Sequence, residues 1–374
     1  MRKICYFINS DWYFDLHWLD RAKGTQAEGF NVHIISDFKN DSIKNKLEEN
    51  GFHCHKSNLN SQSLNPFSFF ISLTYLFNLL KKIDADIIHC ITIKPCLIGG
   101  LYARLFKKKA VISFVGLGRI FSSHNCAYRL IQALILPLYR YIFSNPRIAL
   151  LFEHENDRQQ LVHLTQIPLD KTSVIDGAGI DTALFDFKAE PDKSVPTVLF
   201  ASRLLKSKGL YDLIQIKQML LDEGIIFNLD VAGIIVKDDS DAIDLKLVEK
   251  WHKKNLITWL GQRSDIEKLI SQSHIVALPS VYPEGVPRIL IEGASIGRAL
   301  IAYDSGGCSS IIQNDVNGFL IPRGNLMELK SKLKILLTDA NLRKKMGAQS
   351  RKLVIKKFSS SIVLYKTLVV YQSL

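Results

Sequence analysis

Paired cysteines are missing from this sequence. The six cysteines among its 374 residues are scattered, and no two of them are spaced as C-x-x-C. Several fall in apolar runs, where a thiol behaves as a small core side chain. The spacing therefore argues against a disulfide framework and against a zinc site, and it fits a reducing compartment.

Long apolar runs are missing as well. No stretch reaches the ~20 apolar residues that a membrane-spanning helix needs. The apolar run from Ile4 to Ile8 is too short for a signal peptide with its cleavage site, so we predict a first β-strand there. These absences predict a cytoplasmic protein, either free or peripheral on the cytoplasmic face of the inner membrane.

Acidic residues are absent from one long segment. Between Asp86 and Glu153 the sequence has no Asp or Glu, and its only charged residues there are Lys94, Arg104, Lys107, Lys108, Lys109, Arg119, Arg129, Arg140 and Arg147. The whole chain carries a formal net charge of +12. Such an excess suggests an anionic partner: nucleic acid, a phosphate-bearing substrate or an acidic membrane surface. A solvated basic face explains it equally well.

Two helical segments of the first half, Pro66–Lys82 and Ala127–Phe143, are apolar with basic residues at their flanks or on one face. Such helices can lie in the plane of a membrane interface. They can equally be core helices of a domain, and the sequence leaves both interpretations open.

Short β-branched runs alternate with longer amphipathic ones twice along the chain. Hydrophobic residues make up 47% of the sequence and charged residues 22%, which is typical of globular proteins. The alternation predicts an α/β fold with two Rossmann-like domains, each a parallel sheet with helices on both faces. We place the first domain at residues 1–185, the second at 186–359 and a final helix at 360–374. The polar stretch Phe185–Pro196 reads as an interdomain linker.

The segment from Ser280 to Glu292 carries the strongest chemical signal. A turn rich in Pro and Gly, including Glu284 and Gly285, follows the predicted strand Ile275–Leu278, and a helix opens near Pro287. The first free amides of that helix, those of Arg288, Ile289 and Leu290, can bind a phosphate. The alternative is an acidic loop followed by an exposed helical Glu292.

A second constellation is formed by Arg203 and Lys208. Arg203 follows the predicted strand Thr197–Phe200, and Lys208 opens the next helix. Arg can hold two phosphate oxygens at once, whereas Lys acts as a point charge. Alone, this spacing is more typical of a surface, and its weight comes from lying in the same domain as Glu284.

Together these residues resemble the retaining GT-B glycosyltransferases of family 4. The similarity comprises Arg203 and Lys208–Gly209, Trp259–Arg263 with Asp265, Glu284 with Glu292, Gly293–Arg298, Asp304–Cys308 and Asn317–Leu320. In the first half, Lys94–Pro95 with Gly99–Gly100, Val115–Gly118 and Gly177–Asp181 resemble the subgroup that builds lipid-linked bacterial oligosaccharides. Asp84-Ala85-Asp86 has D-x-D spacing, but it precedes a strand and we expect a loop.

The resemblance implies two domains facing each other across a cleft, with the terminal helix crossing back onto the first domain. It implies that Arg203 and Lys208 bind the donor diphosphate, that Glu284 contacts the transferred sugar and that Glu292 contacts the ribose. The implied donor-binding set is completed by Arg263, Gly285, Ile289, Leu290 and Gly116. The loop after the first strand lacks the Gly-Gly pair of many members, and many carry a His where this chain has Val115-Gly116. We therefore consider His17, expected at the start of the first helix, as a catalytic candidate beside the alternative of an ordinary helix residue.

The resulting expectation is a retaining enzyme that moves a hexose or N-acetylhexosamine from a UDP-sugar to a lipid-diphosphate-linked saccharide. It would form an α-linkage and need neither metal nor cofactor. An anionic membrane surface is an expected partner and nucleic acid is not, because no reader motif appears. The alternatives are a nucleotide-sugar epimerase or phosphorylase-like enzyme, an NAD-dependent oxidoreductase and a non-catalytic assembly subunit. The oxidoreductase fits poorly because Gly116-Leu117-Gly118 lacks the third glycine.

Overall fold

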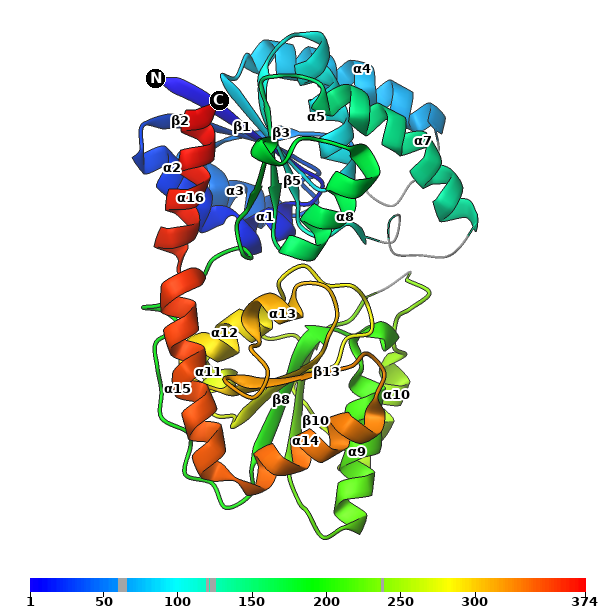
Figure 1. The fold of residues 1–374 in the computed structure, drawn as a ribbon, viewed down its shortest axis with the longest axis vertical. Coiled ribbons are helices and arrows are strands. Elements are labelled where there is room, and N and C mark those ends of the chain that lie inside the picture. The colour runs from blue at the N-terminus through cyan, green and yellow to red at the C-terminus, as the bar shows by residue number, and fades with distance from the viewer. Residues whose placement is uncertain (60–65, 119–120, 122–125, 237–238) are drawn as a thin grey trace. The chain divides into compact units, whose positions relative to one another are not determined.

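The strand–helix alternation folds into two parallel sheets, one in each of two units of the chain (Figure 1). The computed structural model describes residues 1–59, 66–118, 121, 126–236 and 239–374, without the side chains of residues 66–71 and 127. Unit 1 comprises Met1–Gly179 with Ser360–Leu374, and unit 2 comprises Ile180–Ser359. Arg119, one of the basic residues of the acid-free segment, lies outside the described residues.

Unit 1 contains a seven-stranded parallel sheet in its described part, in the order β3-β2-β1-β4-β5-β6-β7. The strands are β1 Arg2–Ile8, β2 Phe30–Ser36, β3 His53–Lys56, β4 Ile87–Ile91, β5 Lys109–Phe114, β6 Ile148–Phe152 and β7 Thr172–Val174. The helices are α1 Asp11–His17, α2 Leu19–Ala27, α3 Asp41–Glu49, α4 Pro66–Ile83, α5 Ile93–Leu105, α7 Cys126–Phe143, α8 Glu155–Thr165 and α16 Ser360–Ser373, with a 3-10 turn at Leu169–Lys171. The chain switches from one side of β1 to the other between β3 and β4, so the switch point lies between β1 and β4.

Unit 2 contains a six-stranded parallel sheet among its described residues, in the order β10-β9-β8-β11-β12-β13. The strands are β8 Thr197–Arg203, β9 Asn228–Ile234, β10 Thr258–Trp259, β11 Ile275–Leu278, β12 Ala299–Tyr303 and β13 Gly318–Ile321. The helices are α9 Leu210–Asp222, α10 Leu245–Lys253, α11 Ile266–Ser271, α12 Arg288–Ile296, α13 Cys308–Ile311, α14 Leu326–Thr338 and α15 Ala340–Lys357, with a 3-10 turn at Lys206–Lys208. Its switch point lies between β8 and β11.

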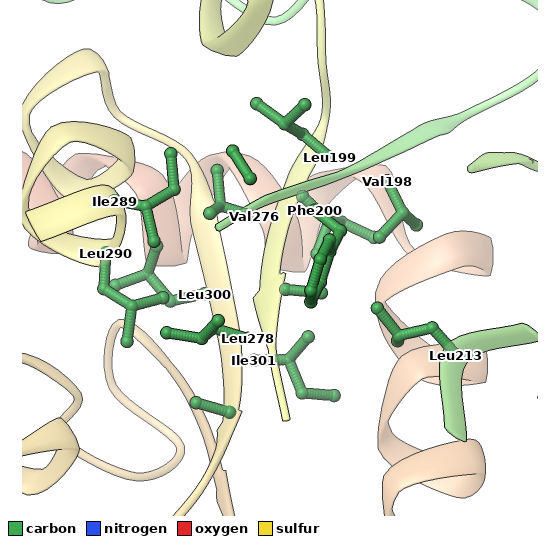
Figure 2. Close-up of a cluster of buried hydrophobic side chains, with 14 of the residues drawn as sticks. Val198, Leu199, Phe200, Leu213, Val276, Leu278, Ile289, Leu290, Leu300 and Ile301 are labelled. Carbon is green, nitrogen blue, oxygen red and sulfur yellow. The ribbon is translucent and has the colours of Figure 1, made fainter. Parts of the chain in front are cut away.

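The core of unit 2 supports this switch point. Figure 2 shows Phe200 of β8 and Leu278 of β11 among apolar side chains from neighbouring strands and from α9 and α12. Phe200 and Leu290 are fully buried, and Leu278 is 2% exposed. Strands buried on both faces read as continuous apolar runs, which is why these strands were recognisable from the sequence.

The boundary between the units differs from the expected one. The units divide between Gly179 and Ile180, whereas the sequence-based boundary follows residue 185. Ile180 and Phe185 are buried in the hydrophobic core of unit 2, so the residues before the expected boundary already belong to that unit.

The interpretation of Phe185–Pro196 as an interdomain linker was wrong. The buried guanidinium of Arg298 donates hydrogen bonds to the carbonyls of Lys188 and Ala189. Arg343 forms an ion pair with Glu190. The segment therefore runs along unit 2 and is held there by buried arginines.

Three further features bear on the sequence-based predictions: the Asp84–Asp86 segment, the cysteines and the length of the apolar helices. Asp84-Ala85-Asp86 is a loop, as expected: Asp84 forms an ion pair with Lys108, and the Asp86 carboxylate accepts a hydrogen bond of 2.7 Å from the amide of Lys3. All six cysteines are free. Across the described ranges, none of the helices combines the length and apolar character that a bilayer crossing requires.

Candidate functional site

The site in unit 2 is built on the loops that leave β8 and β11. These strands are neighbours in the sheet, with Val198 paired to Ile275. Since parallel strands end at the same edge, the loops that follow them meet at the switch point, where open α/β sheets bind ligands. The amide of Val281 in the second loop donates to the carbonyl of Ser207 in the first at 2.8 Å, so the two loops are joined directly.

The central feature is an ion pair between Lys208 and Glu284. The Lys208 ammonium contacts Oε1 of Glu284, and the two side chains are 9% and 12% exposed. The ring of Tyr282 lies 5.8 Å from the same ammonium. The structure thus brings together two residues that the sequence predicted for one site, and it shields both from water.

Glycines allow the close approach of these loops. Gly209, directly after Lys208, has φ +84°, and a Cβ there would lie 1.9 Å from the carbonyl oxygen of Pro279. Gly306 has φ +57°, and its Cβ would lie 2.0 Å from the carbonyl oxygen of Glu284. The loop that follows β12 therefore presses against the backbone of Glu284 and fixes its position.

The sequence predicted that Lys208 begins the helix after β8, and this prediction was wrong. Lys208 ends the 3-10 turn Lys206–Lys208, and α9 begins at Leu210 after the left-handed Gly209. The glycine interrupts the helix and turns the Lys208 side chain toward Glu284.

Glu292 is buried on the second turn of α12. It is 6% exposed, which excludes the alternative of an exposed helical residue. Nε of Arg288 donates to Oε1 of Glu292 at 2.8 Å. Burial raises the pKa of the Glu292 carboxyl, and the charge of Arg288 opposes that rise. The sequence did not identify Arg288 as the partner, although the i, i+4 spacing is a recognisable signal.

The sequence predicted free backbone amides at the start of α12, and the structure agrees only in part. The amide of Leu290 donates to the carbonyl of Pro287 at 3.1 Å, so the expectation of a free amide was wrong there, while the donor-binding role of Leu290 stays a prediction. The amide of Ile289 has no such backbone bond within the described residues. The side chains of both residues point into the core (Figure 2). Gly285 lies in the loop just before, where its carbonyl oxygen would be 2.6 Å from a Cβ at Gly307.

Two arginines extend the same edge of the sheet. Arg203 ends β8 with an exposed side chain and has no ion pair in the part of the chain that the structure describes. Arg263 lies in the loop after β10 and forms a bidentate pair with Asp265, at 2.7 Å and 2.6 Å. That loop is tied to β9 by a hydrogen bond of 2.9 Å from the amide of Gly233 to the carbonyl of Gly261.

His17 and Gly116 belong to unit 1. His17 is the last residue of α1 and not near its start, so its expected place in the helix was wrong. Its half-buried ring lies 4.3 Å from that of Tyr13. Gly116 follows β5 with φ +121°, a conformation that glycine accepts most readily.

The switch point of unit 1 holds features that the sequence did not reveal. The side-chain oxygens of Asn9, after β1, and of Thr92, after β4, are buried without a hydrogen-bond partner among the described residues. Thr92 has φ +74° and ψ 160°, a region that glycine almost alone adopts. Burial lowers the pKa of Lys94 in the first turn of α5. Ile8 pairs with Ile91, which makes the residues after these two strands neighbours.

Metal ligands do not gather in the described residues. No group of three or more His, Cys, Asp and Glu side chains there could hold a metal ion. The buried cation that the structure shows at the unit 2 site is the ammonium of Lys208.

Both halves of the chain match families of known proteins. Residues 181–353 match the family described as Glycosyl transferases group 1, and residues 3–151 match the family described as Glycosyl transferase 4-like. The N,N'-diacetylbacillosaminyl-diphospho-undecaprenol alpha-1,3-N-acetylgalactosaminyltransferase of Campylobacter jejuni is 27% identical over 316 residues, which cover 81% of each chain.

Two further similarities are informative. The UDP-Gal:alpha-D-GlcNAc-diphosphoundecaprenol alpha-1,3-galactosyltransferase of Escherichia coli is 25% identical over 301 residues, covering 77% of this chain and 75% of its own. The solved structure of Anabaena Alr3699/HepE in complex with UDP-glucose superposes with a TM-score of 0.80 at 18% identity and covers all of both chains. Its likeness supports the fold, two parallel-sheet α/β domains of GT-B type. The chain is therefore a glycosyltransferase, with a Glycosyl transferase 4-like domain followed by a Glycosyl transferases group 1 domain.

Proposed function

We propose that this glycosyltransferase moves a hexose or N-acetylhexosamine from a UDP-sugar to a lipid-diphosphate-linked saccharide, as in O-antigen, capsule or glycan assembly, with retention and an α-linkage. The relatives from Campylobacter jejuni and Escherichia coli support this acceptor class and linkage, since their names give alpha-1,3 transfer to saccharides on diphospho-undecaprenol. The UDP-glucose complex of the Anabaena protein supports the donor class.

The buried Lys208–Glu284 pair is the observation that carries the proposal. As the bond between sugar and diphosphate breaks, negative charge grows on the leaving group, and a preorganised cation in a shielded site stabilises it. Without donor, Glu284 neutralises Lys208. When the diphosphate binds, the ammonium turns to its oxygens, and the freed carboxylate accepts hydrogen bonds from hydroxyls of the sugar. Arg203, exposed at the end of β8, adds a second cation for the diphosphate.

Glu292 and the Trp259–Arg263 turn bind the nucleoside part of the donor. The buried Glu292 carboxylate pairs with Arg288 and, among the described residues, with no second cation, so it retains lone pairs that a ribose diol can satisfy. The amide of Ile289 and the backbone of Gly285 lie just before Glu292 along the chain and offer donors to phosphate oxygens. The turn with Arg263 follows the next-but-one strand of the sheet and contacts the base. No metal takes part, because Lys208 and Arg203 supply the positive charge.

The carboxyl edge of unit 1 is our candidate for the acceptor. The unpaired oxygens of Asn9 and Thr92 need hydrogen-bond donors, which sugar hydroxyls provide. Lys94 offers a positive charge to an acceptor diphosphate. The roles of His17 and Gly116 in sugar binding stay predictions.

A UDP-release assay tests the proposal. The protein is incubated with a panel of UDP- and GDP-sugars and a short undecaprenyl-diphosphate-sugar analogue, and the anomeric configuration of the product is read by NMR. We expect release that depends on both a UDP-sugar and the acceptor. Lys208→Ala lowers kcat about 10²–10³-fold, because its contact strengthens in the transition state. Glu292→Gln mainly raises KM for the donor, because a ribose contact binds ground and transition states alike.

Full turnover by a folded Lys208→Ala variant would overturn the assignment of the site. A product with inverted anomeric configuration would contradict the proposed retention but not the assignment as a glycosyltransferase. Conversion of the UDP-sugar without transfer would indicate an epimerase, and no turnover with any donor would favour an assembly subunit.

A further inference from the structure

The outward face of α7 is apolar, although it is exposed to solvent. The exposed residues of this helix recur every three or four positions, as expected for one face. We call them the α7 face: Cys126, Arg129, Leu130, Ala133, Leu134, Pro137, Arg140 and Tyr141. Leu130 is 64% exposed and Leu134 is 70% exposed. Apart from the two arginines, nothing on this face is charged.

The opposite face of α7 packs into the hydrophobic core of unit 1. Tyr139, Ile142 and Phe143 are buried in the core beneath β5 and β6. The helix therefore has one apolar face in the core and a second one in solvent. Soluble domains rarely leave a helix apolar on both sides, and an exposed apolar face of this kind marks an interaction surface.

For α4, the sequence also left open whether the helix lies in a membrane interface or in a domain core, and the structure gives a different answer than for α7. In the described part of α4, Leu76, Leu80 and Ile83 are buried, while Asn78, Lys81 and Lys82 face outward together with Thr74 and Tyr75. An apolar inner face with a polar outer one is the ordinary pattern of a core helix. The structure thus separates two segments that composition alone could not distinguish.

The C-terminal end of α5 extends the α7 face. Leu105 and Phe106 are 51% and 49% exposed. The guanidinium of Arg104 lies 5.0 Å from the ring centre of Tyr141 and donates to Oγ of Ser144 at 3.2 Å, which joins the two helices. Figure 1 shows α7 and α5 together in unit 1.

The charged residues carried by α7 and by the C-terminal end of α5 are all basic. Arg104, Lys107, Arg129 and Arg140 flank its apolar residues, and the sequence has no acid anywhere from residue 87 to residue 152. A protein partner would ordinarily meet both signs of charge on such a rim. An apolar helix face whose own charged residues are all arginines matches a bilayer with anionic headgroups, into whose boundary an interfacial helix inserts its apolar side chains.

We propose that the α7 face, together with Leu105 and Phe106, docks the protein on an anionic lipid bilayer. The leucines enter the acyl boundary, and Arg129 and Arg140 contact headgroup phosphates. Because α7 follows the loop that leaves β5, its first turns lie at the carboxyl edge of the sheet of unit 1. Docking would bring that edge, with Asn9 and Thr92, next to the membrane. Only this last consequence depends on the proposed lipid-linked acceptor.

Vesicle flotation tests the docking surface. The full-length protein is mixed with vesicles of phosphatidylcholine containing phosphatidylglycerol, or of phosphatidylcholine alone, at low and high salt. We expect binding to the anionic vesicles that weakens with salt. The double variant Leu130→Glu and Leu134→Glu weakens binding about tenfold for each leucine removed from the acyl boundary. Arg129→Gln weakens it about fivefold, the effect of one headgroup contact.

Leu221→Glu is the matched control. Leu221 is exposed on α9 of unit 2, so Leu→Glu there adds one negative charge, as each leucine of the double variant does, without touching the α7 face. It should float like the parent protein. The double variant should turn over a short water-soluble acceptor at the parent rate, which separates loss of docking from loss of catalysis.

Three results would overturn the proposal. Equal flotation of the parent and the double variant would remove the α7 face from membrane binding. Binding that depends neither on salt nor on phosphatidylglycerol would show that the arginines do not contact anionic headgroups. A parent dimer that the double variant converts to monomers, as seen by analytical ultracentrifugation, would assign the α7 face to a second copy of this chain.

Discussion

At the scale of single residues, the position of Lys208 depends on a glycine beside it. Gly209 lets the loops after β8 and β11 approach until no side chain fits between them. We predict that Gly209→Ala forces these loops apart, lowers the free energy of unfolding by more than the ~1–2 kcal/mol of a left-handed alanine and abolishes most UDP release. Urea denaturation and the transfer assay measure the two effects.

Gly224 provides the matched control for this change. It has φ +76°, close to that of Gly209, but no atom lies within 4 Å of a Cβ built there. Gly224→Ala should therefore carry only the conformational cost and keep full activity. Equal losses for the two variants would show that the contact with Pro279 does not matter.

The sequence predicted the residue types of this site but not their pairing. Lys208 and Glu284 are 76 residues apart, and no local pattern states that their side chains meet. The order of the strands decides it, because β8 and β11 become neighbours only in the folded sheet. The same holds for Asn9 and Thr92, which no sequence signal had marked as a pair.

At the scale of elements, residues 186–196 illustrate how a polar, proline-containing stretch can be fixed. His274 is 2% exposed, and its Nδ1 accepts a hydrogen bond of 3.0 Å from the amide of Thr197. Its Nε2 lies 3.1 Å from the carbonyl of Pro191 and is the donor of that hydrogen bond. A neutral imidazole satisfies both partners, so one histidine ties the segment to the start of β8.

This arrangement predicts a loss of stability in acid. Burial, reinforced by nearby Arg343, Lys193 and Arg298, lowers the pKa of His274 from its ordinary 6.5 to about 4. The unfolded chain therefore binds a proton before the folded one does, and this stabilisation is complete above 6.5 and is lost as the pH falls toward about 4. Urea unfolding across this range should show the slope, and His274→Gln should make it shallower. Burial also lowers the pKa values of His33 and His89, which contribute to the remaining slope. His163→Gln, a change at an exposed site in α8, should leave the slope unchanged.

Some elements were predictable from sequence and others were not. The central strands are apolar runs buried on both faces, and the prediction placed them to within a few residues. The edge strand β3, His53–Lys56, was missed because its sequence, His-Cys-His-Lys, carries no apolar alternation. Its pairing with β2 comes from the sheet and not from its own composition.

At the scale of the whole molecule, α16 returns the end of the chain to unit 1. Tyr371 lies in the core of that unit, and its hydroxyl is 2.5 Å from Nδ1 of buried His89 and 3.2 Å from the hydroxyl of Tyr6. Nε2 of His89 is 2.6 Å from Oγ of Ser113. The last residues of the sequence thus complete a polar network among the first strands.

Removing one hydroxyl from this network should destabilise unit 1 selectively. Tyr371→Phe leaves Nδ1 of His89 buried without that partner, which costs about 1–3 kcal/mol. Hydrogen exchange of the β4 amides should accelerate, while exchange in β8 and β11 stays at the parent rate. Tyr365→Phe, at a position 69% exposed on the same helix, should change neither. Equal acceleration in both units would contradict the assignment of α16 to unit 1.

The sequence by itself determined the fold class, the two successive α/β domains and the residue types of the proposed donor site. These properties follow from local periodicity and from short motifs, both of which depend only on residues that are close together in the sequence. The tertiary structure alone decided that Lys208 pairs with Glu284, that Glu292 is buried against Arg288 and that residues 186–196 belong to unit 2. It also decided that α7 turns an apolar face to solvent, unlike residues 72–83 of α4, the part whose side chains the structure describes. Each of these depends on which strands become neighbours and which helix face is covered, and long-range packing sets both.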